Sequence, residues 1–111
     1  MESMEKKTQV FKNRTIDIFG SKYYIKFVDK VVDSENNWIY GAVDVLNKVI
    51  RISTTLPCGK PVQKEELETT LIHELLHAIL ISGQYNNCSN DEPLVEWISR
   101  CFVSLRKQKI L

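Results

Sequence analysis

The sequence predicts an α+β fold in which a small antiparallel or mixed sheet is followed by two helices. Residues 14–53 alternate apolar with polar positions and are rich in β-branched and aromatic residues, as strands are. Residues 62–107 repeat apolar residues at intervals of three and four, as amphipathic helices do. Pro57, Gly59 and Pro61 lie between the two parts. Because the strands come first and the helices second, we expect an α+β arrangement.

The strand region is expected to form two hairpins. Arg14 to Asp29 alternates on either side of Gly20-Ser21, where the first turn is predicted. Trp38 to Leu46 and Val49 to Ser53 are expected to form the second pair of strands, with Asn47-Lys48 between them.

The first helix is expected to begin near residues 62–64 and to end at Gly83, a natural C′ residue. Its apolar residues cover most of its circumference, so we expect it in the core. A polar loop over residues 84–90 leads to the second helix.

The second helix is expected to span Asp91 to about Lys107, with Asn90 or Asp91 as its N-cap and Pro93 in its first turn. The spacing of its apolar residues predicts a stripe that faces the core, consisting of Val95, Ile98, Phe102 and Leu105.

Length and composition bound the possible functions. At 111 residues the chain is expected to be a single domain, residues 1–111, of which residues 1–12 would be frayed or weakly helical. A net charge of +1 gives no reason to expect nucleic acid or a membrane surface as partner. Three cysteines without C-x-x-C spacing are typical of reduced thiols. With no signal peptide or membrane span in the sequence, we expect a cytoplasmic protein.

The run His73-Glu74-Leu75-Leu76-His77 is the most informative feature for function. On a helix, residues four apart share a face, so both imidazoles can turn toward one ion while Glu74 reaches a water molecule on it. Catalytic zinc takes imidazole nitrogens at about 2.0–2.1 Å and keeps one position for water. We therefore interpret His73 and His77 as buried zinc ligands and Glu74 as the general base. The alternative is a core helix whose histidines bond to the backbone and whose glutamate faces solvent.

A catalytic zinc site needs a third protein ligand, and the segment after Gly83 supplies Asp91, Glu92 and Glu96 as candidates. Glu92 and Glu96 are four apart, so one can bind the metal while the other accepts a hydrogen bond from a ligand histidine. We favour Glu92 as the metal ligand and keep Glu96 as the hydrogen-bonding partner or alternative ligand. Without a metal, both would be ordinary acids near a helix start. Cys88, in the loop between the helices, is interpreted as incidental.

These residues resemble a known family. The motif above, followed by Glu92-Pro93-Leu94-Val95-Glu96, is similar to zincin metallopeptidases of the gluzincin kind, in which a glutamate ligand follows an HExxH helix. Chain size, with Tyr40-Gly41-Ala42-Val43-Asp44 and Ile50-Arg51-Ile52-Ser53, resembles the small phage and prophage zinc peptidases related to the ImmA/IrrE group. The resemblance covers roughly residues 38–105. The E-x-x-small-x-x-Phe signature of that group also fits Glu96, Ser99 and Phe102, which leaves the choice of glutamate open.

The resemblance implies a minimal zincin-like fold and a zinc-dependent peptidase in the cytoplasm, or in a host cytoplasm if the chain is a phage protein. Its substrate would be a peptide or protein, and Glu74 would pass a proton from a zinc-activated water to the leaving amine. An edge strand would pair with the substrate, for which Val49 to Ser53 is the best candidate.

An oxyanion partner is also expected, and its candidates are Tyr40, Tyr85 and Arg100. Two other interpretations remain open from the sequence. The first is a zincin-shaped phage or prophage binding or regulatory protein with a structural zinc. The second is a metal-free phage protein.

Overall fold

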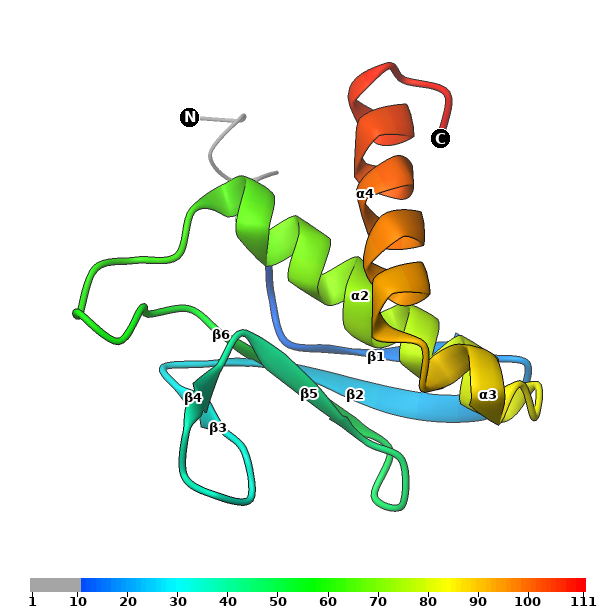
Figure 1. The fold of residues 1–111 in the computed structure, drawn as a ribbon, viewed down its shortest axis with the longest axis horizontal. Coiled ribbons are helices and arrows are strands. Elements are labelled where there is room, and N and C mark those ends of the chain that lie inside the picture. The colour runs from blue at the N-terminus through cyan, green and yellow to red at the C-terminus, as the bar shows by residue number, and fades with distance from the viewer. Residues whose placement is uncertain (1–10) are drawn as a thin grey trace.

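The computed structural model describes residues 11–111 and confirms the predicted α+β class. A mixed sheet forms one layer, helix α2 crosses it, and helix α4 stands against α2 (Figure 1). The elements in chain order are β1 (Arg14–Ile18), β2 (Ser21–Val28), β3 (Val31–Val32), β4 (Trp38–Ile39), β5 (Gly41–Asp44), β6 (Val49–Ser53), α2 (Lys64–Ser82), α3 (Asn86–Ser89) and α4 (Glu92–Lys107).

The four-stranded sheet has the order β1-β2-β6-β5. Both predicted hairpins are present, because β1 pairs antiparallel with β2 and β5 pairs antiparallel with β6. The first turn lies at Phe19-Gly20, one residue earlier than predicted, and both residues have positive φ (48° and 88°) as in a type I′ hairpin turn. The hairpins join through β2 and β6, which run parallel. β6 is therefore an interior strand, and β5 is an edge strand.

The long strand predicted from Trp38 to Leu46 is interrupted at Tyr40. Its first part, β4, pairs with β3 in a separate two-stranded ribbon, while β5 pairs with β6. The fully buried Ser53 fastens the ribbon to the sheet. Its Oγ accepts a hydrogen bond from the Val31 N–H at 2.7 Å and donates one to the Ile39 carbonyl at 2.7 Å. These two bonds hold the ribbon beside the end of β5.

The core lies between the sheet and α2. In β6 the alternation predicted from the sequence is present, because Ile50 and Ile52 are buried and Arg51 is exposed. Burial of apolar area on this scale is the main driving force for folding. The central cluster consists of Tyr23, Ile25, Ile50, Ile52, Leu71 and Ala78.

Helix α2 begins within the predicted range but ends differently. Gly83 is the C-cap residue with φ −87°, and Gln84 takes the left-handed conformation with φ 65°. The Tyr85 N–H donates to the Leu80 carbonyl and the Gln84 N–H to the Ile81 carbonyl, which is the bonding pattern of a Schellman motif. The prediction of Gly83 as the C′ residue was therefore wrong by one position. An added Cβ at Gly83 would lie 3.0 Å from the Tyr85 ring, which is a close approach.

Helix α4 begins as predicted. Asp91 is the N-cap, its side chain accepts a hydrogen bond from the Leu94 N–H at 3.2 Å, and a proline lies in the first turn. Within the polar loop that precedes it, residues 86–89 form the short helix α3, which the sequence reading missed.

Of the predicted core stripe of α4, Val95 is buried as expected, but the rest of the prediction was wrong. The buried residues of this helix are Val95, Ser99 and Val103, whereas Phe102 and Leu105 are exposed. The buried row is one that packs against α2, the main contact of α4.

Of the segment expected to be frayed, residues 1–10 lie outside the described residues. Phe11 packs edge-on against Phe27, with the ring centroids 5.8 Å apart. None of the helices in residues 11–111 combines the length and the apolar composition needed to cross a bilayer.

Candidate metal centre

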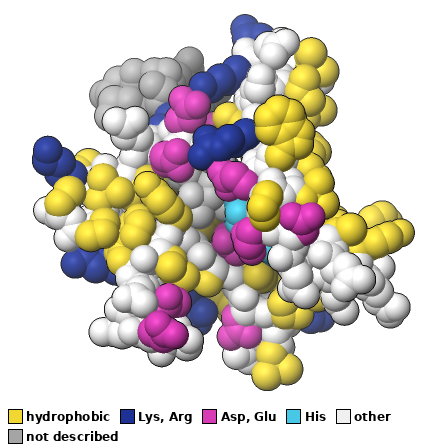
Figure 2. Space-filling model, in the orientation of Figure 1, with side chains coloured by type: hydrophobic (Ala, Val, Ile, Leu, Met, Phe, Trp, Pro, Cys, Tyr) yellow, Lys and Arg dark blue, Asp and Glu magenta, His cyan; other side chains and the backbone are white. Residues whose placement is uncertain are grey.

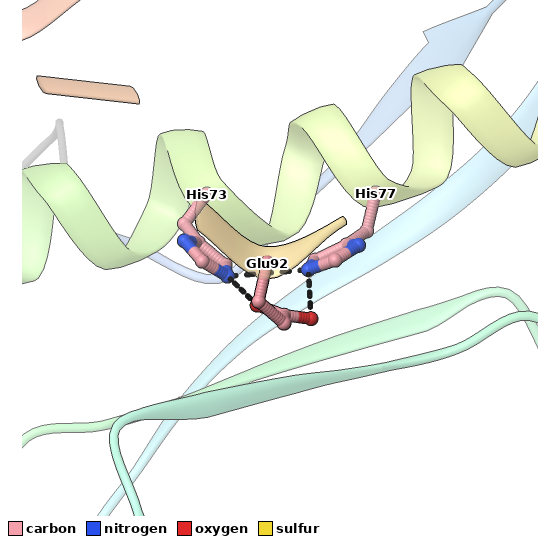
Figure 3. Close-up of side chains that lie close together, drawn as sticks. All are labelled: His73, His77 and Glu92. Carbon is pink, nitrogen blue, oxygen red and sulfur yellow. Dashed lines mark hydrogen bonds and ion pairs between the residues drawn. The ribbon is translucent and has the colours of Figure 1, made fainter. Parts of the chain in front are cut away.

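The two histidines of α2 point their Nε2 atoms toward each other. They lie one helical turn apart, and the Nε2 atoms are 3.1 Å apart. His77 is buried as predicted, whereas His73 is half-buried. Figure 3 shows both rings on the same side of the helix, facing the first turn of α4.

Glu92, the first residue of α4, reaches both rings. Its Oε2 lies 3.0 Å from His73 Nε2, and its Oε1 lies 3.0 Å from His77 Nε2 (Figure 3). Asp91, the neighbouring candidate, caps the helix and thereby fixes where this turn begins. Atoms of His73, His77 and Glu92 lie within 4.8 Å of one another, so these three residues could hold a metal ion.

The remaining nitrogen of each ring has its own partner. His73 Nδ1 lies 2.9 Å from Glu96 Oε2, and His77 Nδ1 lies 3.0 Å from the Oγ of Ser89, which is buried in α3. Glu96 is in turn held by Arg100, whose Nε donates to its Oε1 at 2.7 Å. Such partners fix the ring orientation and tautomer of metal-binding histidines.

These contacts make the centre suitable for a cation. Both ring nitrogens of His73 face carboxylates, Nδ1 that of Glu96 and Nε2 that of Glu92, and an ionised carboxylate can only accept hydrogen bonds. A neutral ring can donate to only one of them, and in the tautomer whose Nδ1 donates to Glu96, Nε2 carries a lone pair. That lone pair faces the Glu92 carboxylate and the second imidazole. Three electron-rich atoms converging on one point repel one another unless a proton or metal ion lies among them. Donors around a tetrahedral zinc ion are about 3.3 Å apart for bonds of about 2.0–2.1 Å, close to the 3.0–3.1 Å spacings here.

Glu74 lies in the same cleft but is not part of this three-residue group. Glu74 is buried, with an exposed fraction of 7%. The pKa of Glu74 is raised to about 7, mainly because the carboxyl group is buried; His73 opposes this shift and the nearby Glu92 carboxylate adds to it. A carboxyl group with a pKa near neutrality can both accept and release a proton at physiological pH.

A glycine in β5 allows this arrangement. A Cβ built on Gly41 would lie 2.8 Å from Thr70 Cγ2, 3.0 Å from the Arg51 carbonyl oxygen and 3.3 Å from Glu74 Cγ. Contacts this short are not tolerated in a packed interior without movement of the neighbours. Gly41 therefore lets α2 approach the edge strand closely at the turn that carries Glu74.

The centre opens into a cleft of about 790 Å³. Figure 2 shows a histidine side chain in a hollow bordered by acidic side chains, with a basic side chain nearby. The acidic and basic lining comes mainly from α2 and α4, whereas Trp38, Ile39, Tyr40, Val43 and Val45 line the side formed by β4, β5 and the turn that follows. Thus one wall of the cleft is apolar and the other is charged.

Two of the three proposed oxyanion partners line this cleft. Tyr40 and Arg100 are among its lining residues, and Arg100 is already bound to Glu96. Tyr85 instead lines a separate groove with Phe19 and Ile79. Tyr40 is thus the lining candidate whose side chain is not committed to Glu96.

The structure brings together the residues singled out from the sequence. His73, His77 and Glu92 converge, Glu74 lies beside them, and Glu96 lies on the far nitrogen of His73. Sequence reasoning missed Ser89 and Gly41. Ser89 gave no signal because it is a short polar residue in a segment expected to be loop. Gly41 follows an aromatic residue inside a predicted strand, and an isolated glycine in a strand can signal close approach of another backbone or side chain.

No model of a known protein family matches the chain, and neither do curated proteins or solved structures. The chemistry of this centre is therefore argued from its own geometry.

Proposed function

We propose that this chain is a zinc-dependent peptidase with a minimal zincin-like fold. The observation that carries the proposal is the buried Glu74, next to a group of donors that fits a metal and outside that group. A structural zinc site is closed by four protein ligands and needs no such carboxylate, whereas a catalytic site keeps one position open. Here three protein donors converge at the base of an open cleft.

The donor set favours zinc among the common metals. Two imidazole nitrogens with one carboxylate are a typical catalytic zinc set, whereas magnesium and calcium prefer oxygen donors alone. The hydrogen bonds to Glu96 and Ser89 would hold both rings in the tautomer that presents Nε2 to the ion.

Each side chain then has a separate role. A zinc ion held by His73, His77 and Glu92 would polarise a carbonyl and lower the pKa of a water molecule toward about 7. Glu74 would take the proton from that water and deliver it to the departing amine nitrogen. Its raised pKa suits both transfers, because a group that is too acidic would not accept the proton.

The edge of the sheet suggests how a peptide would bind. Val49 to Ser53 was the expected docking strand, but β6 is paired on both sides, with β2 and β5, so it has no free edge. Of the two edge strands, β1 and β5, it is β5 that borders the cleft, through Gly41 and Val43. An extended peptide added to β5 would lie beside the metal centre with apolar side chains against Val43 and Val45. We therefore propose an extended peptide segment with apolar side chains as the substrate class.

Comparison of three zinc-loaded proteins tests this function. Wild type, Glu74→Gln and Glu65→Gln are each incubated with a peptide library derived from a whole proteome, and new termini are counted by mass spectrometry. Glu65 lies in the same helix but pairs with Lys107 at 2.8 Å, so it serves as the matched control. Wild type and Glu65→Gln are expected to cleave peptides, and Glu74→Gln is expected to bind zinc equally and lose at least about 100-fold in rate.

Cleavage by Glu74→Gln at the wild-type rate would exclude Glu74 as the base. Zinc binding by all three proteins without cleavage by any of them would favour the non-catalytic alternative, a zinc-containing binding or regulatory protein.

A further inference from the structure

The face of α4 that points away from α2 is apolar and exposed. Its residues recur at spacings of three and four, so they form one continuous stripe along the helix. Trp97 near its middle is 68% exposed. Figure 2 shows hydrophobic side chains along this side of the helix. We name it the outer face of α4, and it consists of Leu94, Trp97, Ile98, Cys101, Phe102 and Leu105.

The chain end extends this face. Lys109 has φ 61°, and the Ile110 N–H donates to the Leu105 carbonyl at 3.1 Å. In this type of helix end, the residue after the left-handed one usually contacts the side chain of the residue whose carbonyl it bonds. Ile110, itself largely exposed, therefore adds apolar surface next to Leu105.

No charged residue interrupts the outer face. The charged side chains of α4 are instead engaged elsewhere. Arg100 pairs with Glu96, Arg106 with Glu68 at 2.7 Å, and Lys107 with Glu65 at 2.8 Å. An apolar stripe of this size is at the upper end of what monomers expose, and patches of this kind are often interaction sites.

We propose that the outer face of α4 is the interface of a homodimer, in which two copies of α4 pack against each other about a two-fold axis. In such an interface a charge close to the two-fold axis would meet the same charge of its copy and be repelled, and the residues of the outer face carry no charge. The proposal is independent of the peptidase function, because the outer face lies opposite the side of α4 that carries Glu92.

The exposed area of the outer face is large enough for a specific dimer interface. The six residues of the outer face and Ile110 together expose on the order of 600 Å², given about 150–250 Å² for a whole large side chain. Two copies would bury on the order of 1,200 Å², which exceeds the roughly 1,000 Å² expected of a specific interface.

Two other partners, residues 1–10 of the chain and a membrane surface, match the outer face less well. Residues 1–10 contain four charged residues against three apolar ones, a poor match to an apolar stripe. A helix that binds a membrane surface usually carries free basic residues beside its apolar face. Here three of the four basic residues of α4 and the chain end, Arg100, Arg106 and Lys107, are in ion pairs, and Lys109 is the fourth.

Sedimentation of wild type, Trp97→Lys and Phe19→Lys over a range of concentrations tests the interface. Phe19 is a fully exposed aromatic residue that lies away from this face, in the turn between β1 and β2. Wild type and Phe19→Lys are expected to dimerise equally, and Trp97→Lys is expected to weaken dimerisation at least about 30-fold, as for a central aromatic anchor. Leu105→Lys provides a second variant on the same face, and circular dichroism checks that each variant is folded.

Cross-linking tests the geometry. Cys101 lies near the middle of the outer face, so in an antiparallel pair it would face its own copy. A short bismaleimide is expected to cross-link Cys58→Ser/Cys88→Ser into a covalent dimer and to fail once Cys101→Ser is added. A wild-type monomer at all concentrations, or dimers unaffected by both lysine variants, would overturn the proposal. A monomer that floats with anionic lipid vesicles would overturn it in favour of a membrane partner.

Discussion

The two faces of the 16-residue helix α4 differ in the side chains that they carry and in what these side chains contact. On the side toward α2, polar side chains are in specific contacts, since Glu92 reaches both histidines and Glu96 joins His73 to Arg100. On the outer face, large apolar side chains are exposed. The comparison teaches that an amphipathic pattern predicts that a helix has an apolar face, but not what covers it. Substitutions on the two faces are therefore expected to have different consequences.

The largest expected effects are on zinc affinity and concern two residues on the side of α4 that faces α2. Glu92→Ala removes a proposed metal ligand and is expected to weaken zinc binding by more than about 100-fold, whereas Glu96→Ala removes a hydrogen bond to a ligand and is expected to cost about 10–100-fold. Competition with a chromogenic chelator measures both affinities. A greater loss in Glu96→Ala would exchange the two roles.

Glu74 makes the stability of the zinc-free protein depend on pH. The pKa of Glu74 is raised from 4.5 to about 7 by burial, so the folded protein holds more protons than the unfolded chain between these values. The contribution of Glu74 to the stability of wild type therefore falls as pH rises through this window, and it is lost above about pH 7. Glu74→Gln stays neutral, so relative to its stability near pH 4 it is expected to gain about 3 kcal/mol over wild type at pH 8.

Urea unfolding of the chelator-treated proteins at both pH values measures this difference. Glu35→Gln, an exposed glutamate in the loop between β3 and β4, is the control and is expected to follow wild type. An equal stability difference at both pH values would show that ionisation of Glu74 does not oppose folding.

Alanine substitution of one residue on each face of α4 shows which of the two faces is packed within the monomer. Val103→Ala removes buried methyl groups against α2 and is expected to cost about 2 kcal/mol in unfolding free energy. Trp97→Ala is expected to cost less than about 1 kcal/mol at concentrations too low for dimerisation, despite the larger side chain. Denaturant unfolding of dilute protein checks both values. A greater cost for Trp97→Ala would mean that the outer face is packed within the monomer.

The smallest expected effect on zinc binding concerns the ring of His77. Ser89→Ala removes the hydrogen-bond partner of Nδ1, so the ring is less well oriented and zinc binding is expected to weaken about 10-fold. Ser104→Ala, an exposed serine of α4, is the matched control and is expected to leave zinc affinity unchanged. Equal affinities for Ser89→Ala and wild type would show that α3 has no part in positioning the metal.

Predictions from the sequence were confirmed where they depend on the local geometry of a helix. The HExxH spacing predicted which residues converge, and Asp91 with Pro93 predicted the start of α4, because both depend on local helix geometry. Such predictions failed where the answer depends on distant partners. The parallel pairing of β2 with β6 made β6 an interior strand, and the buried row of α4 is set by contact with α2 rather than by apolar content. The hydrogen bond between His77 and Ser89 likewise depends on how the loop folds.

Zinc content of wild type and His77→Ala, purified identically without chelator or nickel, tests the metal centre most directly. Elemental mass spectrometry is expected to find one zinc per wild-type chain and none in His77→Ala, because two donors hold zinc poorly. The melting temperature of the variant should fall as well, since metal binding stabilises only the folded state. Absence of zinc from wild type, or its retention in His77→Ala, would contradict the proposed centre.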